Sequence, residues 1–118
     1  MGKQPESKLS TAIQKAWRTR GAWTFKVHGS EMQPAGIPDI CAVYKGRSIW
    51  CESKMPGGHG LSQIQRYRIN HIREAGALVV VAYSVEDAVQ MIDHIETSDC
   101  THARNECLYR AHIALEKK

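Results

Sequence analysis

The spacing of apolar residues along the chain predicts three amphipathic helices. In residues 7–20, apolar side chains recur every three or four positions, which is the period of one helix face. Ser62 is expected to begin the second helix, because Gln65 completes a capping-box pattern, and Gly76 to end it. Ser84 can cap the third. Its apolar positions are Val85, Ala88, Val89, Ile92 and Ile95.

Four segments have instead the β-branched and aromatic composition of strands. The short connection Lys45-Gly46 between the second and third predicts an antiparallel hairpin. The fourth is almost uniformly apolar, as expected of a central strand covered on both faces. The four segments are residues 22–27, 38–44, 47–53 and 77–83.

The resulting order is helix, three strands, helix, strand and helix, followed by a candidate terminal helix at residues 103–115. This order predicts a small α/β sandwich with a mixed sheet. The 118 residues contain no internal repeat and fit one domain, 1–118, with a core at about 6–95 and a helical extension at about 100–116. The extension has more apolar residues than one small core requires, which favours a homodimer. They are Leu108, Tyr109, Ile113 and Leu115.

Composition indicates the cellular compartment and the kinds of partner to be expected. No signal peptide precedes the four cysteines, so a reducing, cytoplasmic context is expected, with Cys41 and Cys51 as small core residues. The three tryptophans, Trp17, Trp23 and Trp50, are expected in the core or covering the sheet. No apolar run is long enough to span a bilayer, so no membrane partner is predicted. A net charge of +4 is compatible with a polyanionic partner.

Three charged residues stand out because they interrupt strand-like segments. Glu52 and Lys54 are two apart on one strand and therefore leave the same face. The hairpin would bring Asp39 close to Glu52, and two adjacent carboxylates repel unless a cation such as Mg²⁺ or Mn²⁺ lies between them. Taken singly, Asp39 after a proline is common in turns, and Glu52 with Lys54 is an ordinary surface ion pair. Their combination favours hydrolysis of phosphodiester bonds.

These residues carry a resemblance to a known family. "GIPD", twelve further residues, "ESK", and a helix opening "LSQIQ" after a glycine-rich loop resemble the PD-(D/E)XK nuclease superfamily, and most closely its small VRR-NUC members. The resemblance implies an α/β fold with a restriction-endonuclease-like core and a central mixed sheet flanked by helices. It also implies a Mg²⁺-dependent or Mn²⁺-dependent DNA endonuclease, without a small-molecule cofactor, of bacterial or phage origin.

The resemblance also assigns roles. Asp39 and Glu52 would be metal ligands and Lys54 the catalytic lysine. The backbone carbonyl of Cys51, or of Ser53, would complete the metal site. Two roles depend on helix register: Gln65, with Gln63 as its rival, would assist at the site, and Glu6 would be a further acidic ligand. The serine at position 53, where an aliphatic residue is common, is expected not to touch the catalytic side chains.

Several basic and histidine side chains are candidate contacts to the DNA backbone, although solvated surface positions would look the same. They are Lys26, His28, Lys45, Arg47, His59 and Arg66. Two other functions remain open: a homodimeric resolvase of the Holliday-junction type, and a non-catalytic nucleic-acid-binding module. A zinc site near the C-terminus is disfavoured by the spacing of its candidate ligands. Those are Cys100, His102, Cys107 and His112.

Overall fold

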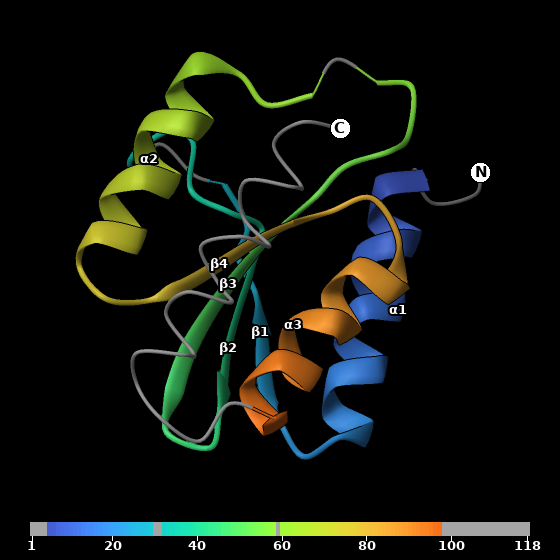
Figure 1. Ribbon diagram of the computed structural model, residues 1–118. Helices are drawn as coiled ribbons and strands as arrows, with labels where there is room; N and C mark the ends of the chain where they lie inside the picture. Colours follow the sequence, from blue (N-terminus) through green and yellow to red (C-terminus); the bar gives the residue numbers. More distant parts are fainter. Residues whose placement is uncertain (1–4, 30–31, 59, 98–118) are drawn as a thin grey trace.

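The computed structural model describes residues 5–29, 32–58 and 60–97. A four-stranded sheet lies between α1 and α3 on one face and α2 on the other (Figure 1). The predicted order of elements and the mixed sheet are confirmed. The elements are α1 (Pro5–Thr19), β1 (Trp23–Lys26), β2 (Ile40–Tyr44), β3 (Arg47–Ser53), α2 (Gln63–Glu74), β4 (Leu78–Ala82) and α3 (Val85–Thr97).

The strands lie in the order β1-β2-β3-β4, with both antiparallel pairs at one side and the parallel pair β3–β4 at the other. The predicted hairpin joins β2 to β3 through Lys45 and Gly46, whose φ angles are 49° and 78°. Two consecutive positive φ angles are those of a type I′ turn, whose twist matches that of the strands it joins. The turn therefore fixes the register of β2 against β3.

The face of the sheet that carries α1 and α3 is called here the inner face, and it holds one part of the core, which continues on the other face beneath α2 at Ile69. Trp17 on α1 is fully buried and donates its indole N–H to the carbonyl of Ala88 on α3, 2.9 Å away, so that it ties the two helices together. Ile13, Ile40 and Ile49 are also fully buried. In β2 the buried residues alternate with more exposed ones, whereas all five residues of β4 are buried because both faces of that strand are covered.

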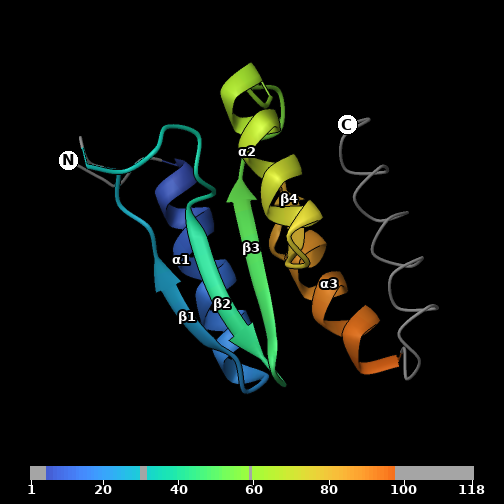
Figure 2. The same cartoon turned by 90° about the vertical axis from the view of Figure 1, so that its left-hand side faces the viewer.

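The opposite, outer face is covered unevenly. Figure 2 shows α2 in front of β4, with β1 and β2 uncovered on the same side. Trp23 is 60% exposed there, Phe25 53% and Val43 44%, and Cys41 is half-buried. Placing Cys41 in the core was therefore wrong, and of the two positions expected for Trp23, core or sheet surface, the structure shows the sheet surface, because no helix of the described chain covers this side of β1 and β2.

The start of α2 follows the sequence prediction. The Ser62 hydroxyl accepts a hydrogen bond from the Gln65 backbone N–H, and the Gln65 side chain accepts one from the Ser62 backbone N–H, which completes the capping box. Gly36, with φ +83°, lies so close to this turn that a Cβ there would be 2.6 Å from the Ile64 carbonyl oxygen. The loop before β2 and the first turn of α2 are thus in direct backbone contact.

None of the helices in the described part of the chain combines the length and apolar character needed to cross a bilayer. The candidate helix at residues 103–115, its apolar residues and the four candidate zinc ligands lie outside the described residues.

Candidate active site

The register of the sheet brings the two predicted carboxylates to the same end of β2 and β3. Ile40 pairs with Cys51, and the same antiparallel register continued by one residue sets Asp39 beside Glu52. The backbone N–H of Val27 donates to the Asp39 carbonyl at 2.8 Å, which continues the β1–β2 ladder by one pair. Asp39 thus lies between the ends of β1 and β3.

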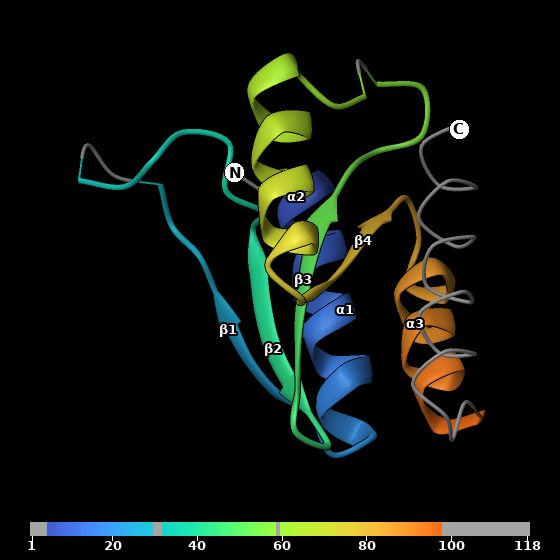
Figure 3. The same cartoon turned by 60° about the vertical axis from the view of Figure 1, so that its left-hand side comes forward.

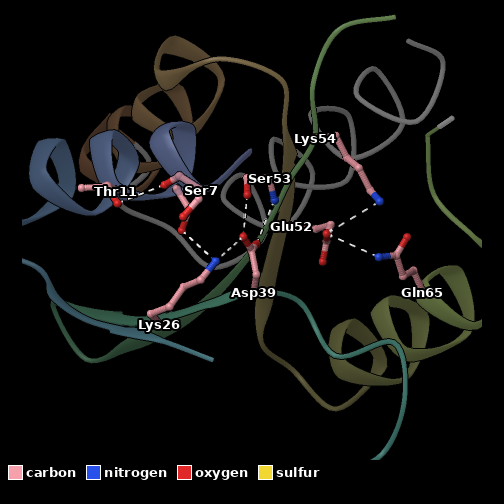
Figure 4. Close-up of polar contacts among 9 residues, drawn as sticks. Ser7, Thr11, Lys26, Asp39, Glu52, Ser53, Lys54 and Gln65 are labelled. Carbon is pink, nitrogen blue, oxygen red and sulfur yellow. Dashed lines mark hydrogen bonds and ion pairs between the residues drawn. The ribbon is translucent and has the colours of Figure 1, made fainter. Parts of the chain in front are cut away.

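Asp39 is held by three donors. Its Oδ1 accepts the backbone N–H of Ser53 at 2.9 Å, and its Oδ2 accepts the Ser53 hydroxyl and the Lys26 ammonium, the latter at 3.0 Å. Lys26 also donates to the hydroxyl of Ser10 on α1 at 3.1 Å. Figure 4 shows Lys26 and Ser53 meeting at the Asp39 carboxylate. Ser53 therefore does contact a proposed metal ligand, contrary to the sequence prediction.

Glu52 is held from the other direction, by Lys54 and Gln65 (Figure 4). Its Oε2 lies 3.8 Å from the Lys54 ammonium nitrogen and accepts a hydrogen bond from the Gln65 amide at 3.4 Å. Burial raises the pKa of Glu52 to about 8, with Asp39 and, more weakly, Glu6 adding to the rise, while Lys54 and Lys26 oppose it. The main cause of the raised pKa is thus the burial of the Glu52 carboxylate, to which the neighbouring Asp39 adds.

Gln65 joins this site to the capping of α2. Its side-chain oxygen accepts the Ser62 N–H at 2.9 Å, which leaves the amide NH₂ to point at Glu52. The cap thereby fixes which end of the amide faces the carboxylate. Gln63, the alternative considered from the sequence, is solvent-exposed. The structure thus places Gln65 at the carboxylates.

A pocket of about 370 Å³ opens beside these groups. Asp39, Glu52 and Gln65 form its polar end, and the loop between β1 and β2 forms its other wall. Arg68 on α2 supports that wall by donating to the carbonyl of Ala35 at 2.8 Å. The loop residues of the wall, together with Val27 at the end of β1, are Gly29, Gln33, Pro34, Ala35, Gly36 and Ile37.

The donor set fits a hard divalent cation. Each carboxylate oxygen can accept about two hydrogen bonds, so both acceptor positions of Asp39 Oδ2 are filled while Oδ1 retains one. Glu52 supplies further oxygen ligands at a position where a positive charge would relieve the unfavourable burial of its anion. Among the described residues, no three His, Cys, Asp or Glu side chains form a metal-binding group. A cation would therefore rely on two carboxylates plus backbone oxygen or water.

Two other predicted members of the metal site, Glu6 and Cys51, lie close enough to the carboxylates to interact with them electrostatically. Glu6 lies in the first turn of α1, exposed, and near enough to raise the pKa of Glu52. Cys51 is fully buried on the inner face, and burial together with Asp39 and Glu52 raises the pKa of its thiol well above the ordinary value. The Cys51 side chain is therefore a neutral core group, and a role for its carbonyl stays a prediction.

The candidate DNA contacts are scattered. Lys26 is engaged by Asp39, and Lys45 pairs with Glu96 at 2.9 Å at the opposite end of the sheet. Arg47 is half-buried at that end, close to a second surface pocket between the hairpin and the end of α2. His28 is exposed near the proposed site, Arg66 is exposed on α2, and His59 lies outside the described residues. Among the described members of this set, Lys26 directly contacts a proposed catalytic residue, Asp39.

Sequence reasoning missed the contacts of Lys26 and Ser53 with Asp39. A usable signal was present, because both residues occupy inner-face positions of their strands, where a polar side chain needs a buried partner. Asp39, one residue before β2, is the acceptor that both can reach.

Comparison with known proteins finds solved structures with the same fold as this chain. No protein-family model and no curated protein matches the sequence. A solved VRR_NUC domain superposes with a TM-score of 0.64 and 21% identity over 75% of this chain and 95% of that one. Hjc, a Holliday junction resolvase from Archaeoglobus fulgidus, superposes with a TM-score of 0.53 and 23% identity over 64% of this chain and 65% of that one. The chain therefore shares the α/β fold of these two structures, with its mixed sheet flanked by helices.

Proposed function

We propose that this protein is a metal-dependent DNA endonuclease whose active site is the pocket bounded by Asp39, Glu52 and Gln65. The observation that carries the proposal is the buried Glu52 carboxylate, held by Lys54 and Gln65 across from a second carboxylate. A buried carboxylate with a strongly raised pKa costs stability, and such groups are concentrated at functional sites. The nuclease fold of the similar structures supports the same conclusion.

Each side chain has a specific task in this proposal. Asp39 Oδ1 and the Glu52 carboxylate would hold Mg²⁺ or Mn²⁺, which would supply Lewis-acid activation of water and phosphate. Lys54 provides a positive charge for the phosphate oxygens as negative charge develops on them. Gln65 orients Glu52, and Lys26 with Ser53 fixes the rotamer of Asp39.

The distribution of charge supports an approach of DNA from the outer face. Helix α2, which lies on that face, carries three arginines and a single acidic residue, Glu74, at its end. Helix α3, on the inner face, carries four acidic residues and neither lysine nor arginine. Although helix α1, also on the inner face, is basic, α2 attracts a polyanion on the outer face, and its residue Gln65 lines the pocket. The arginines are Arg66, Arg68 and Arg73, and the acidic residues are Glu86, Asp87, Asp93 and Glu96.

The test is cleavage of labelled linear, nicked, flapped and four-way DNA, with and without Mg²⁺. Glu52→Gln and Lys54→Ala should each lower the rate at least about 100-fold, because they remove a ligand and a charge from the reacting centre. The matched controls are Glu96→Gln and Lys15→Ala, exposed residues on α3 and α1, which should cleave at the wild-type rate. Unchanged cleavage by Glu52→Gln, or full activity in excess chelator, would refute the proposal. Binding without any cleavage would indicate a non-catalytic module.

A second candidate, a homodimeric resolvase, is favoured by the likeness to Hjc. Resolving a junction needs two coordinated cuts, and one active site per chain implies two copies. Cleavage of four-way DNA at least about ten times faster than of linear duplex, with a dimer in light scattering, would support it. A version of the chain ending at Asp99 tests whether the C-terminal segment contributes to the dimer. A monomer that nicks all substrates equally would exclude it.

A further inference from the structure

The outer face of β1 carries two large aromatic rings that take no part in the core. Trp23 and Phe25 are 60% and 53% exposed, and their rings are stacked with centroids 6.1 Å apart and planes inclined by 10°. The residues that alternate with them, Thr24 and Lys26, face inward and hydrogen-bond to α1. Figure 3 shows β1 at the free edge of the sheet. We call Trp23 and Phe25 the aromatic stripe.

The strand register connects this stripe directly to the proposed active site. Phe25 pairs with Cys41, and two residues further along the same two strands Val27 pairs with Asp39, at the edge of the pocket. Trp23 lies one outward position further away, paired with Val43. Outward positions on a strand are roughly 6.6 Å apart. The stripe therefore begins about one such step from Asp39 and leads away from it.

The chemistry of the stripe suits unpaired nucleotides. Bases of single strands stack on exposed aromatic rings, whereas in a duplex the faces of the bases are already occupied by their neighbours. The outward-facing residues between Asp39 and the start of β1 include no acidic side chain in the described chain, so a phosphate backbone would meet no repulsion along this path. Together with the arginines of α2, this leaves the stripe on the side of the molecule that attracts a polyanion.

A second copy of the chain is a less suitable occupant. Each ring exposes roughly 100 Å² of apolar surface, and Val43 adds less. The total is well below the roughly 800 Å² that each partner buries in a stable interface. The stripe is large enough for two bases and too small for a dimer on its own.

We propose that the protein binds DNA with an unpaired segment next to the cleaved phosphate, and that two of the unpaired bases stack on Phe25 and Trp23. The inference rests on the proposed function, since it takes the scissile phosphate to lie at Asp39 and Glu52. It narrows the substrate to flapped, splayed or gapped DNA, with the single strand running along β1 away from the pocket.

The proposal is tested by fluorescence anisotropy of a labelled oligothymidine and of a duplex of equal length, both in chelator so that nothing is cut. The double variant Trp23→Ala/Phe25→Ala should lose at least about tenfold in affinity for the single strand, since each stacked base contributes substantially, and less than threefold for the duplex. Trp23→Phe, which keeps a ring, should bind the single strand within about threefold of wild type. Val43→Ala removes an aliphatic neighbour on the same face and should change neither affinity.

Two outcomes would overturn the inference. One is an equal affinity of the double variant and the wild type for the single strand. The other is a change from dimer to monomer in light scattering with the preference for single strands intact, which would make the stripe an interface between copies. Cleavage by Glu52→Gln is measured in a separate assay. The base-stacking proposal can therefore be refuted while the nuclease proposal stands, and the nuclease proposal can be refuted while base stacking stands. Thermal unfolding of each variant confirms that it is folded.

Discussion

Trp17 and Trp23 lie on opposite sides of the protein although only six positions separate them. Trp17 is fully buried between α1 and α3 and hydrogen-bonded to Ala88, whereas Trp23 is 60% exposed on a part of the sheet that no described helix covers. The inner face is therefore closed by helices, and its buried polar side chains, such as Thr24, are hydrogen-bonded. The outer face combines exposed aromatic rings with a buried carboxylate at the end of the strands.

This difference separates stability from function. Burial of apolar surface on the inner face stabilises the fold, and its side chains have few alternatives of equal volume. On the outer face, the buried Glu52 and the exposed rings of Trp23 and Phe25 each reduce stability or add little to it. Residues that the fold does not need are candidates for binding and chemistry, and substitutions on the two faces should have opposite profiles.

The largest expected effect is on the inner face. Trp17→Ala should lower the free energy of unfolding by about 3–5 kcal/mol, because it leaves a cavity and removes the indole hydrogen bond to the Ala88 carbonyl. Trp23→Ala should change it by less than about 1 kcal/mol, since most of the side chain is already in water. Urea unfolding followed by circular dichroism measures both. Equal losses would mean that Trp23 is covered in solution and would remove the contrast between the faces.

The second effect is a dependence of stability on pH that arises from Glu52. Its pKa is about 8 in the folded chain against 4.5 as the reference, so the folded state holds the proton more tightly than the unfolded state. The stabilisation is thus present below pH 4.5 and is lost as the pH rises to about 8, by up to about 1.4 kcal/mol per pH unit. Glu52→Gln should flatten this slope in chelator, and Glu74→Gln, an exposed control on α2, should not.

The effect of Mg²⁺ on the melting temperature gives a second test of whether Glu52 is ionised. A cation binds the ionised carboxylate, so it should raise the melting temperature of the wild type more at pH 8 than at pH 5 and should have little effect on Glu52→Gln. An equal rise at both pH values would place the cation away from Glu52.

The sequence predicted the architecture well because its local signals agree with one another. The capping box at Ser62, the two-residue turn at Lys45-Gly46 and the apolar β4 are each specified by a few adjacent residues. Asp39 and Glu52 were placed near each other for the same reason, since the register of a hairpin follows from its turn, whereas Gln65 was assigned to the site by the family resemblance.

What the sequence did not predict depends on contacts between distant segments. The aromatic content of β1 is the same whether a helix covers it or not, so the exposure of Trp23 could not be inferred from the strand itself. The Asp39 ion pair requires β1 and the end of β2 to be adjacent, and the contact of Gly36 with Ile64 requires α2 to cross the loop. These features follow from packing, which a local pattern does not specify.

The third expected effect concerns the contact between the loop and α2. Gly36 and Gly21 both have positive φ, +83° and +98°, but an added Cβ would meet the Ile64 backbone in the first case and nothing within 4 Å in the second. Gly21→Ala should therefore cost about 1–2 kcal/mol from backbone strain alone. Gly36→Ala should cost more and should also reduce cleavage, because α2 carries Gln65. If the two variants are equally stable and equally active, the contact does not position the site.

The smallest expected effect is at Ser53, whose hydroxyl donates to Asp39 Oδ2 from the inner side of β3. Ser53→Ala removes this hydrogen bond but keeps the Ser53 backbone N–H on Oδ1 and Lys26 on Oδ2, so Asp39 keeps two donors. The free energy of unfolding should fall by about 1–2 kcal/mol, the contribution of a hydrogen bond to a charged group. Because the acceptor position proposed for the cation is on Oδ1, the Mg²⁺ concentration for half-maximal cleavage should change by less than threefold.

Lys26→Met, which removes the ion pair, is the stronger comparison in the same assay. If Ser53→Ala needs a higher Mg²⁺ concentration for half-maximal cleavage than Lys26→Met does, the Ser53 hydroxyl, rather than Lys26, holds Asp39 in its working rotamer.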